Sequence, residues 1–88
     1  MSIKVRMSPF LSKYANNQRI VEVNGDTVRE CLKHVEEQLS KIRLFEKDGR
    51  LLSYLSIYVN GEITSPKELD RPVKDGDELF MMLMIGGG

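Results

Sequence analysis

A single segment of this chain has the apolar spacing of a long helix. Between Val28 and Ile42, apolar residues recur every three or four positions and face a polar side. Thr27 precedes this pattern and Glu30 follows three residues later, which is the signature of a capping box. We therefore predict one main helix of about four turns over residues 27–42. Because one helix covers only one face of a sheet, the rest of the chain is expected to form a two-layer α+β domain.

Most of the remaining apolar residues alternate with polar ones, as in half-buried strands. Strands are predicted at residues 3–7, 19–23, 55–59, 62–64 and 79–85. Asn60-Gly61 is a strong hairpin signal, Glu46–Arg50 reads as a turn, and residues 65–69 read as one helical turn. This order predicts a β-grasp (ubiquitin-like) fold, with a mixed four- to five-stranded sheet and the main helix on one face.

The last predicted strand runs directly into Gly86-Gly87-Gly88. Glycine costs more backbone entropy to order than any other residue, so three in a row are poor structural material. Without side chains, however, they can enter a narrow channel, and together they extend roughly 10 Å. We expect residues 1–85 to form a single domain and residues 86–88 to be a flexible tail whose Gly88 carboxylate is the functional group. The alternative is a frayed end without a role.

Composition gives little support for nucleic-acid or membrane partners. Thirteen basic and thirteen acidic residues cancel. The first residues lack the apolar core of a signal peptide, and no apolar run approaches the length of a membrane span. We therefore expect a cytoplasmic protein that binds neither nucleic acid nor membrane.

Residues that carry chemistry in other proteins are explained here by structural roles. Cys31 lies on the apolar side of the predicted helix and reads as a small core residue. His34 has no second His or Cys at ligand spacing, so a metal site is not expected. Asp75 and Asp77 flank a tight turn and read as turn-formers. The sequence predicts no catalytic residue, no bound cofactor and no metal.

The combination of the Asp75–Glu78 turn, an apolar last strand and the final Gly87-Gly88 resembles the MoaD/ThiS family of sulfur carriers. This family comprises the small subunit of molybdopterin synthase and the sulfur carrier of thiamine synthesis. Thr27-Val28 at the helix start and Val59–Glu62 in the second hairpin also look like the family's pattern.

The resemblance implies that the chain is a cosubstrate and not itself an enzyme, although it could be the small subunit of a molybdopterin-synthase-type enzyme. A ubiquitin-activating-type adenylyltransferase would use ATP to adenylate Gly88, which then becomes a thiocarboxylate. Gly86 and Gly87 would let this group enter the active sites of its partners. The sulfur acceptor would be a larger catalytic subunit or an enzyme of thiazole synthase type.

Two departures from the family's patterns point in different directions. Met84-Ile85 stand where molybdopterin-type carriers often have proline, which is closer to some thiamine-type carriers. The charged stretch Arg43–Arg50 makes the chain longer than a minimal thiamine carrier, so both pathways stay open. Two other functions also stay open: a ubiquitin-like modifier conjugated through Gly88, and a β-grasp binding module with an inert tail.

Strand alternation predicts a docking patch on the sheet face away from the helix. Leu79, Met81, Leu83 and Ile85 should face the helix, and the residues between them should face the other way. Neighbouring strands add further residues to that face. The predicted docking patch consists of Lys4, Arg6, Tyr58, Phe80, Met82 and Met84. Apolar side chains beside basic ones suit a partner surface, and methionine adapts to more than one partner. The alternative is that residues 10–14 fold over this face and bury it.

Overall fold

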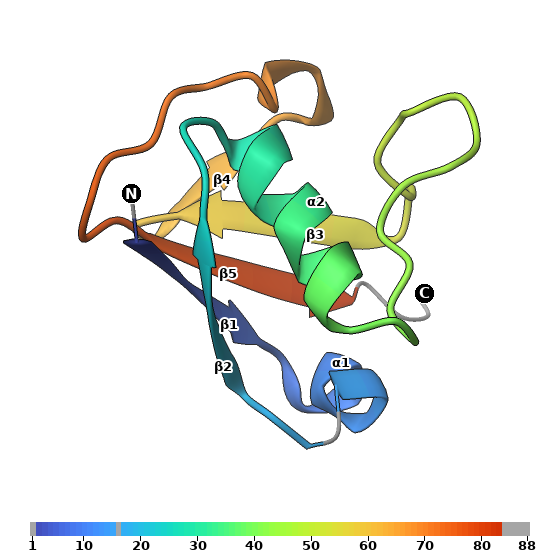
Figure 1. Cartoon of the computed structure of the whole chain (residues 1–88). Helices are drawn as coiled ribbons and strands as arrows, with labels where there is room; N and C mark the ends of the chain where they lie inside the picture. Colours follow the sequence, from blue (N-terminus) through green and yellow to red (C-terminus); the bar gives the residue numbers. More distant parts are fainter. Residues whose placement is uncertain (1, 16, 84–88) are drawn as a thin grey trace.

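The computed structural model describes residues 2–15 and 17–83, which form a five-stranded sheet with a helix across one face (Figure 1). The elements in chain order are β1 (Ser2–Met7), α1 (Pro9–Ser12), η1 (Lys13–Ala15), β2 (Ile20–Asn24), α2 (Val28–Gln38), β3 (Leu55–Val59), β4 (Glu62–Thr64), η2 (Pro66–Glu68) and β5 (Glu78–Leu83). The strand order is β2-β1-β5-β3-β4. The β1–β5 pair is parallel and the other pairs are antiparallel, which confirms the predicted mixed β-grasp sheet.

The core lies between the sheet and α2. In β1, Ile3 and Val5 are fully buried, whereas Lys4 between them is exposed. Leu79 and Met81 of β5 are likewise fully buried, so the predicted alternation is confirmed in both strands. The buried stripe of α2 consists of Val28, Cys31, Leu32 and Val35. Burying each aliphatic side chain of this kind contributes about 1.5–3 kcal/mol relative to leaving it in water.

The helix α2 is shorter than predicted. It ends at Gln38, because Leu39 leaves the helical conformation with φ −119° and ψ 84°. Ile42 is buried as its spacing suggested, but it belongs to the connection that follows. At the other end, Thr27 Oγ1 accepts from the Glu30 N–H at 3.2 Å, which confirms the predicted N-cap. The apolar spacing therefore continued past the end of the helix.

The long connection between α2 and β3 is held against the helix. The Glu36 carboxylate accepts from the backbone N–H groups of Leu44 and Phe45 at 2.7 and 3.2 Å. Lys33 Nζ lies 4.7 Å from the centroid of the Phe45 ring, within cation–π range. These contacts give residues 39–54 a defined course along one side of the molecule (Figure 1).

The predicted turns are present. Within Glu46–Arg50, the Glu46 N–H donates to the Arg50 carbonyl at 2.7 Å. Asn60 and Gly61 have φ values of 49° and 88°, the left-handed conformation that a type I′ hairpin turn requires. The helical turn expected at residues 65–69 is η2.

Candidate functional site

The strand that leads to the predicted tail is the central strand of the sheet. β5 pairs with β1 on one side and with β3 on the other. Its last described residue, Leu83, pairs with Leu55 at the start of β3. The predicted tail residues 86–88 and Met84 of the docking patch lie outside the described residues. The chain that continues from Leu83 is therefore attached to a strand that is hydrogen-bonded on both sides.

The outer face of the sheet, away from α2, brings the described members of the docking patch together. Strand register aligns one residue from each strand in a single row across the sheet. In the order of the strands, the row consists of Ile20, Arg6, Phe80, Tyr58 and Ile63. The Tyr58 and Phe80 rings lie with their centroids 6.1 Å apart and tilted by 51°, a favourable aromatic arrangement. Ile63, which is 64% exposed, was not predicted to belong to this face. It lies in β4, a strand of three residues at the end of the row, which is too short to show an alternating pattern.

The patch is less exposed than predicted. Tyr58, Phe80 and Met82 are half-buried, and Ser56, opposite Met82 in the register, is buried. The aromatic contact between the Tyr58 and Phe80 rings explains part of this burial. The alternative, a lid made by residues 10–14, does not seal the face. Leu11 and Ser12 are buried, whereas the side chains of Phe10, Lys13 and Tyr14 remain exposed.

The two predicted basic residues of the patch, Lys4 and Arg6, lie beside carboxylates. Arg6 Nε lies 2.5 Å from Glu78 Oε1, and the register places Lys4 beside both Glu22 and Glu78. The face thus carries two cations and two carboxylates. An exposed pair such as Arg6–Glu78 adds at most about 1 kcal/mol to stability. Glu78 was identifiable in the sequence, because it has the same strand parity as Phe80.

Cys31 is a core residue, as predicted. It is fully buried, and burial raises the pKa of its thiol to about 11. The thiol therefore stays protonated at neutral pH and is a poor nucleophile. The backbone of Gly25 packs tightly against it, since a Cβ at Gly25 would lie 2.9 Å from both the amide nitrogen and Sγ of Cys31. His34, on the same helix, contacts the Asn24 carbonyl through Nδ1.

Of the two aspartates of the last turn, Asp77 bonds the turn itself, as predicted, whereas Asp75 bonds the start of β1. Asp75 Oδ1 accepts from the Ser2 N–H at 2.8 Å. Asp77 accepts from the Lys74 N–H at 2.9 Å and from Asn60 Nδ2 at 3.0 Å. The hydrogen bond from the Lys74 amide, followed by that from Asn60, holds the pKa of Asp77 below its usual value. Asp77 thus holds the turn that precedes β5, and Asp75 ties this turn to the start of β1.

Across residues 2–15 and 17–83, no group of three or more His, Cys, Asp and Glu side chains is placed to hold a metal ion. Within that part of the chain, no helix is long and apolar enough to cross a membrane.

Comparison with known proteins gives consistent matches. A family model described as the ThiS family matches residues 10–88. The sulfur carrier protein CysO of Mycobacterium tuberculosis is 28% identical over 93 aligned positions that cover both chains completely. The crystal structure of SAMP1 from Haloferax volcanii has a TM-score of 0.85 and 27% identity, with full coverage of both chains. A chain of the BexX/CysO complex of Amycolatopsis orientalis has a TM-score of 0.80 and 30% identity, covering 98% of this chain and 99% of its own.

Proposed function

Because this chain belongs to the ThiS family of sulfur carrier proteins, we propose that it carries sulfur as a thiocarboxylate on Gly88. The observation that carries this proposal is the place of β5, a central strand that leads into the final residues of the family match. A strand held on both sides is a rigid base from which a short tail can be presented. The complete overlap with CysO supports the same reading.

The chemistry needs an activating enzyme, since a free carboxylate is a poor acyl donor. A carboxylate oxygen of Gly88 attacks the α-phosphorus of ATP, which forms the acyl-adenylate and releases pyrophosphate. Sulfide then attacks the carbonyl carbon of the acyl-adenylate. AMP leaves with the carboxylate oxygen that had bonded to its phosphorus. The product is a thiocarboxylate, and no side chain of the carrier takes part in either step. ATP is therefore bound by the partner adenylyltransferase, and the cytoplasm is the compartment that supplies it.

The partners dock on the outer face of the sheet, through the predicted patch. Its aromatic pair, Tyr58 and Phe80, supplies a half-buried apolar centre. The exposed Arg6–Glu78 pair beside it supplies a polar rim of the kind found at interfaces. That a relative of 30% identity has been crystallised in the BexX/CysO complex supports a carrier that binds another protein. Gly86 and Gly87 extend into the partner's site.

The sulfur acceptor in this proposal is a biosynthetic synthase of the molybdopterin or thiamine type. With a synthase of the molybdopterin type, the carrier would be a stable small subunit. With one of the thiamine type, it would be a separate cosubstrate. Purifying the full-length chain together with each candidate synthase from the same genome distinguishes them. A stable complex supports the molybdopterin type, and turnover without one supports the thiamine type.

The proposal is tested by intact-mass spectrometry of the full chain. The protein is incubated with ATP, sulfide and a ubiquitin-activating-type adenylyltransferase from the same genome. We expect a mass increase equal to the replacement of one oxygen by sulfur. A variant that lacks Gly88 should show no increase while keeping the circular dichroism spectrum of the intact protein. An unchanged mass with an adenylyltransferase that is active on its own carrier would overturn the proposal and favour an inert tail.

A second candidate is a protein modifier that becomes amide-linked to lysines through the same activated carboxylate. The similarity to SAMP1, a small archaeal modifier protein, favours it. Isopeptide-linked peptides carrying the C-terminal glycines of this chain, found by mass spectrometry of cell extracts, would establish that activity. Their absence under conditions that yield the thiocarboxylate would leave the carrier function alone.

A further inference from the structure

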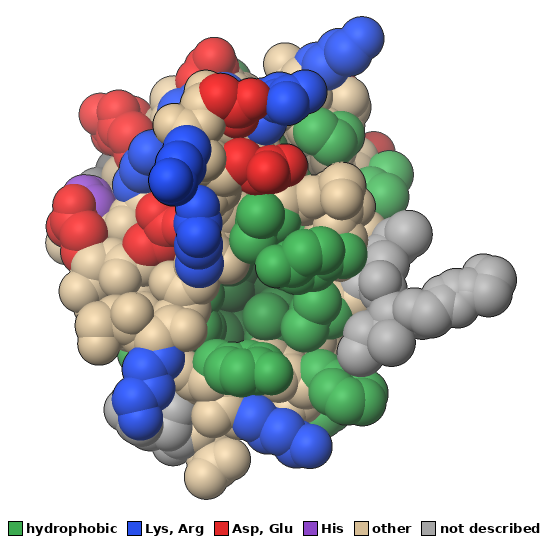
Figure 2. All heavy atoms as spheres, turned by 90° about the vertical axis from the view of Figure 1, so that its right-hand side faces the viewer, with side chains coloured by type: hydrophobic (Ala, Val, Ile, Leu, Met, Phe, Trp, Pro, Cys, Tyr) green, Lys and Arg blue, Asp and Glu red, His purple; other side chains and the backbone are tan. Residues whose placement is uncertain are grey.

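Exposed aromatic side chains gather at the end of the molecule where β5 ends. Phe10, Tyr14 and Tyr54 are 55%, 57% and 48% exposed. The other large hydrophobic residues found exposed in the described part of the chain, Ile20 and Ile63, lie on the outer sheet face. Figure 2 faces this end and shows hydrophobic side chains gathered on it. Apolar surface of this kind commonly marks a contact with another macromolecule.

Segments far apart in the sequence meet around the end of β5. The Ser8 N–H donates to the Met81 carbonyl at 3.0 Å, which holds the start of α1 beside the last residues of β5. On the other side, Tyr54 directly precedes Leu55, the residue that pairs with Leu83. The start of α1 and the residue before β3 thus flank the end of β5.

Two of the segments at this end carry only basic charge. Residues 8–21 and 38–45 contain no Asp or Glu. The cations in these two segments are Lys13, Arg19, Lys41 and Arg43. Lys13 Nζ lies 5.2 Å from the centroid of the Phe10 ring, so a charge and an aromatic face are presented together. Correspondingly, the lower half of Figure 2 shows Lys and Arg side chains and no acidic ones.

The length of the tail determines how close a partner must come. Five residues follow Leu83 in the sequence. Fully extended, they reach about 17 Å. The described molecule measures 34 × 28 × 26 Å, so an active site that receives Gly88 must lie close to this end. An enzyme that takes the tail into a channel therefore has to cover the surface around Leu83 with the rim of that channel.

We infer that a second surface, the tail-end surface, is a contact site for the enzyme that adenylates Gly88. It is distinct from the docking patch on the outer face of the sheet. It consists of Phe10, Lys13, Tyr14, Lys41 and Tyr54. Aromatic side chains give much contact area at little entropic cost, and the cations require carboxylates opposite them. The partner is accordingly an enzyme whose channel mouth has an apolar rim with acidic groups beside it. This inference rests on the proposed function.

The test compares variants of the full chain in adenylyltransferase-dependent ATP–pyrophosphate exchange, with the carrier concentration varied to separate KM from kcat. The Phe10→Ser/Tyr54→Ser double variant should raise KM about tenfold, as expected for the loss of aromatic anchors. Its kcat should not change, because the reacting tail is intact. The Lys13→Glu/Lys41→Glu variant should raise KM about fivefold, and added salt should shrink that difference.

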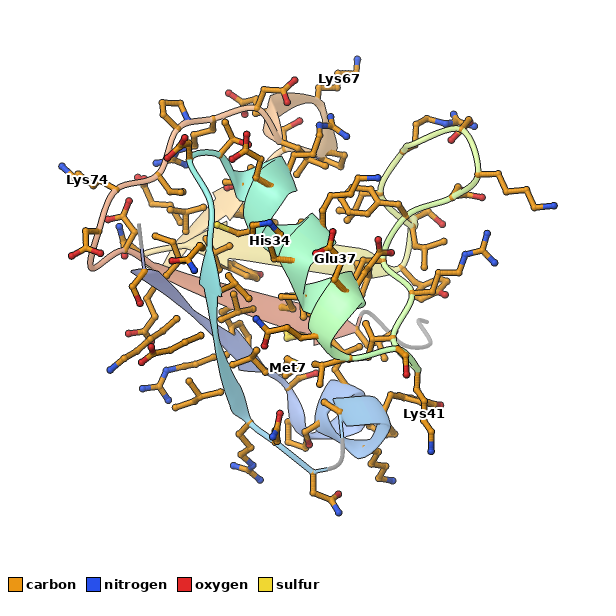
Figure 3. All side chains as sticks on the ribbon, viewed as in Figure 1. Met7, His34, Glu37, Lys41, Lys67 and Lys74 are labelled. Carbon is orange, nitrogen blue, oxygen red and sulfur yellow. The ribbon has the colours of Figure 1, made fainter. Side chains whose placement is uncertain are left out.

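The matched control for charge is Lys74→Glu. Lys74 is exposed and lies on the opposite side of the molecule from Lys41 (Figure 3), so its reversal should leave KM unchanged. If the tail-end variants keep the KM of the unmodified protein, the surface is not a contact and the inference is wrong while the proposed function stands. If the unmodified carrier is not adenylated at all, the proposed function itself fails. Sedimentation equilibrium that shows a dimer broken by Phe10→Ser/Tyr54→Ser would instead assign the surface to a second copy.

Discussion

The two ends of the sheet are built in opposite ways. At the end where β3 turns into β4 and where β5 begins, polar side chains bind backbone groups of the same molecule. Asn60 Oδ1 accepts from the Glu78 N–H and Asn60 Nδ2 donates to Asp77, both at 3.0 Å. At the other end, where β5 stops, Phe10 and Tyr54 are about half exposed. At the first end, here called the turn end, polar side chains form hydrogen bonds within the molecule. At the second, the tail end, aromatic side chains remain exposed to solvent.

This difference shows how one small domain separates stability from recognition. At the end where β5 begins, the side chains of Asn60 and Asp77 hold the backbone through hydrogen bonds, so substitutions that remove these bonds cost stability. Half-exposed aromatic side chains contribute less to folding and remain available for a partner. We therefore expect substitutions at the turn end to change the free energy of unfolding, and substitutions at the tail end to change binding. We expect the effect on stability to decrease from Gly25→Ala through Asp77→Ala to Tyr54→Ser.

The largest effect is expected from Gly25→Ala, between β2 and α2. The new Cβ would lie 2.9 Å from the Cys31 amide nitrogen, a backbone atom that cannot rotate away. The free energy of unfolding should fall by about 2 kcal/mol, as for other overpacked sites. Urea unfolding followed by circular dichroism measures it.

A double-mutant cycle with Cys31→Ala provides the control. Since this change removes Sγ, the second close contact, it should cost less in the Gly25→Ala background than in the unmodified protein. Equal costs in both backgrounds, or an unchanged stability of Gly25→Ala, would show that the turn end can relax.

An intermediate effect is expected from Asp77→Ala, which removes two hydrogen bonds to the turn. The free energy of unfolding at neutral pH should fall by about 1–2 kcal/mol. The pKa of Asp77 is lowered in the folded state from its ordinary value of 3.8, mainly by the Lys74 amide. The stabilisation is therefore fully present above that ordinary value and is lost as the pH falls through the lowered pKa.

Urea unfolding at neutral pH and in acid checks this dependence. The stabilities of the unmodified protein and of Asp77→Ala should converge in acid. Glu37→Ala, which removes an exposed carboxylate on α2, serves as the reference for a general charge effect (Figure 3). A difference between Asp77→Ala and the unmodified protein that does not depend on pH would contradict the assigned role of the carboxylate.

The smallest effect on stability is expected from Tyr54→Ser. Because the side chain is 48% exposed, the free energy of unfolding should change by less than about 0.5 kcal/mol. The same urea titration measures it. A loss comparable to that of Gly25→Ala would show that Tyr54 belongs to the core, and the contrast between the two ends would then not hold.

Local patterns in the sequence predicted much of this protein. Apolar residues at every second position identified the buried and exposed sides of β1 and β5. Asn60-Gly61 identified the hairpin between β3 and β4. These predictions succeed because backbone geometry ties side-chain direction to position along one element. They also placed Phe80 and Tyr58 on the same outer face. Where the pattern had no local stop signal, as at the end of α2, the prediction ran past Gln38.

Two features of the candidate site depended on pairing between distant segments. Arg6 meets Glu78 only because β1 lies parallel to β5 in the observed register. Phe10 and Tyr54 reach the same end of the molecule from segments that share no local pattern.

Short-range periodicity thus predicted the five strands and the main helix, and the direction of their side chains, but it did not predict α1 or η1. The register of the strands, the pairing of their charges and the exposed residues near the end of β5 became visible in the folded molecule alone. The physical reason is that strand register and packing are set by contacts across the core, which no local stretch of sequence contains.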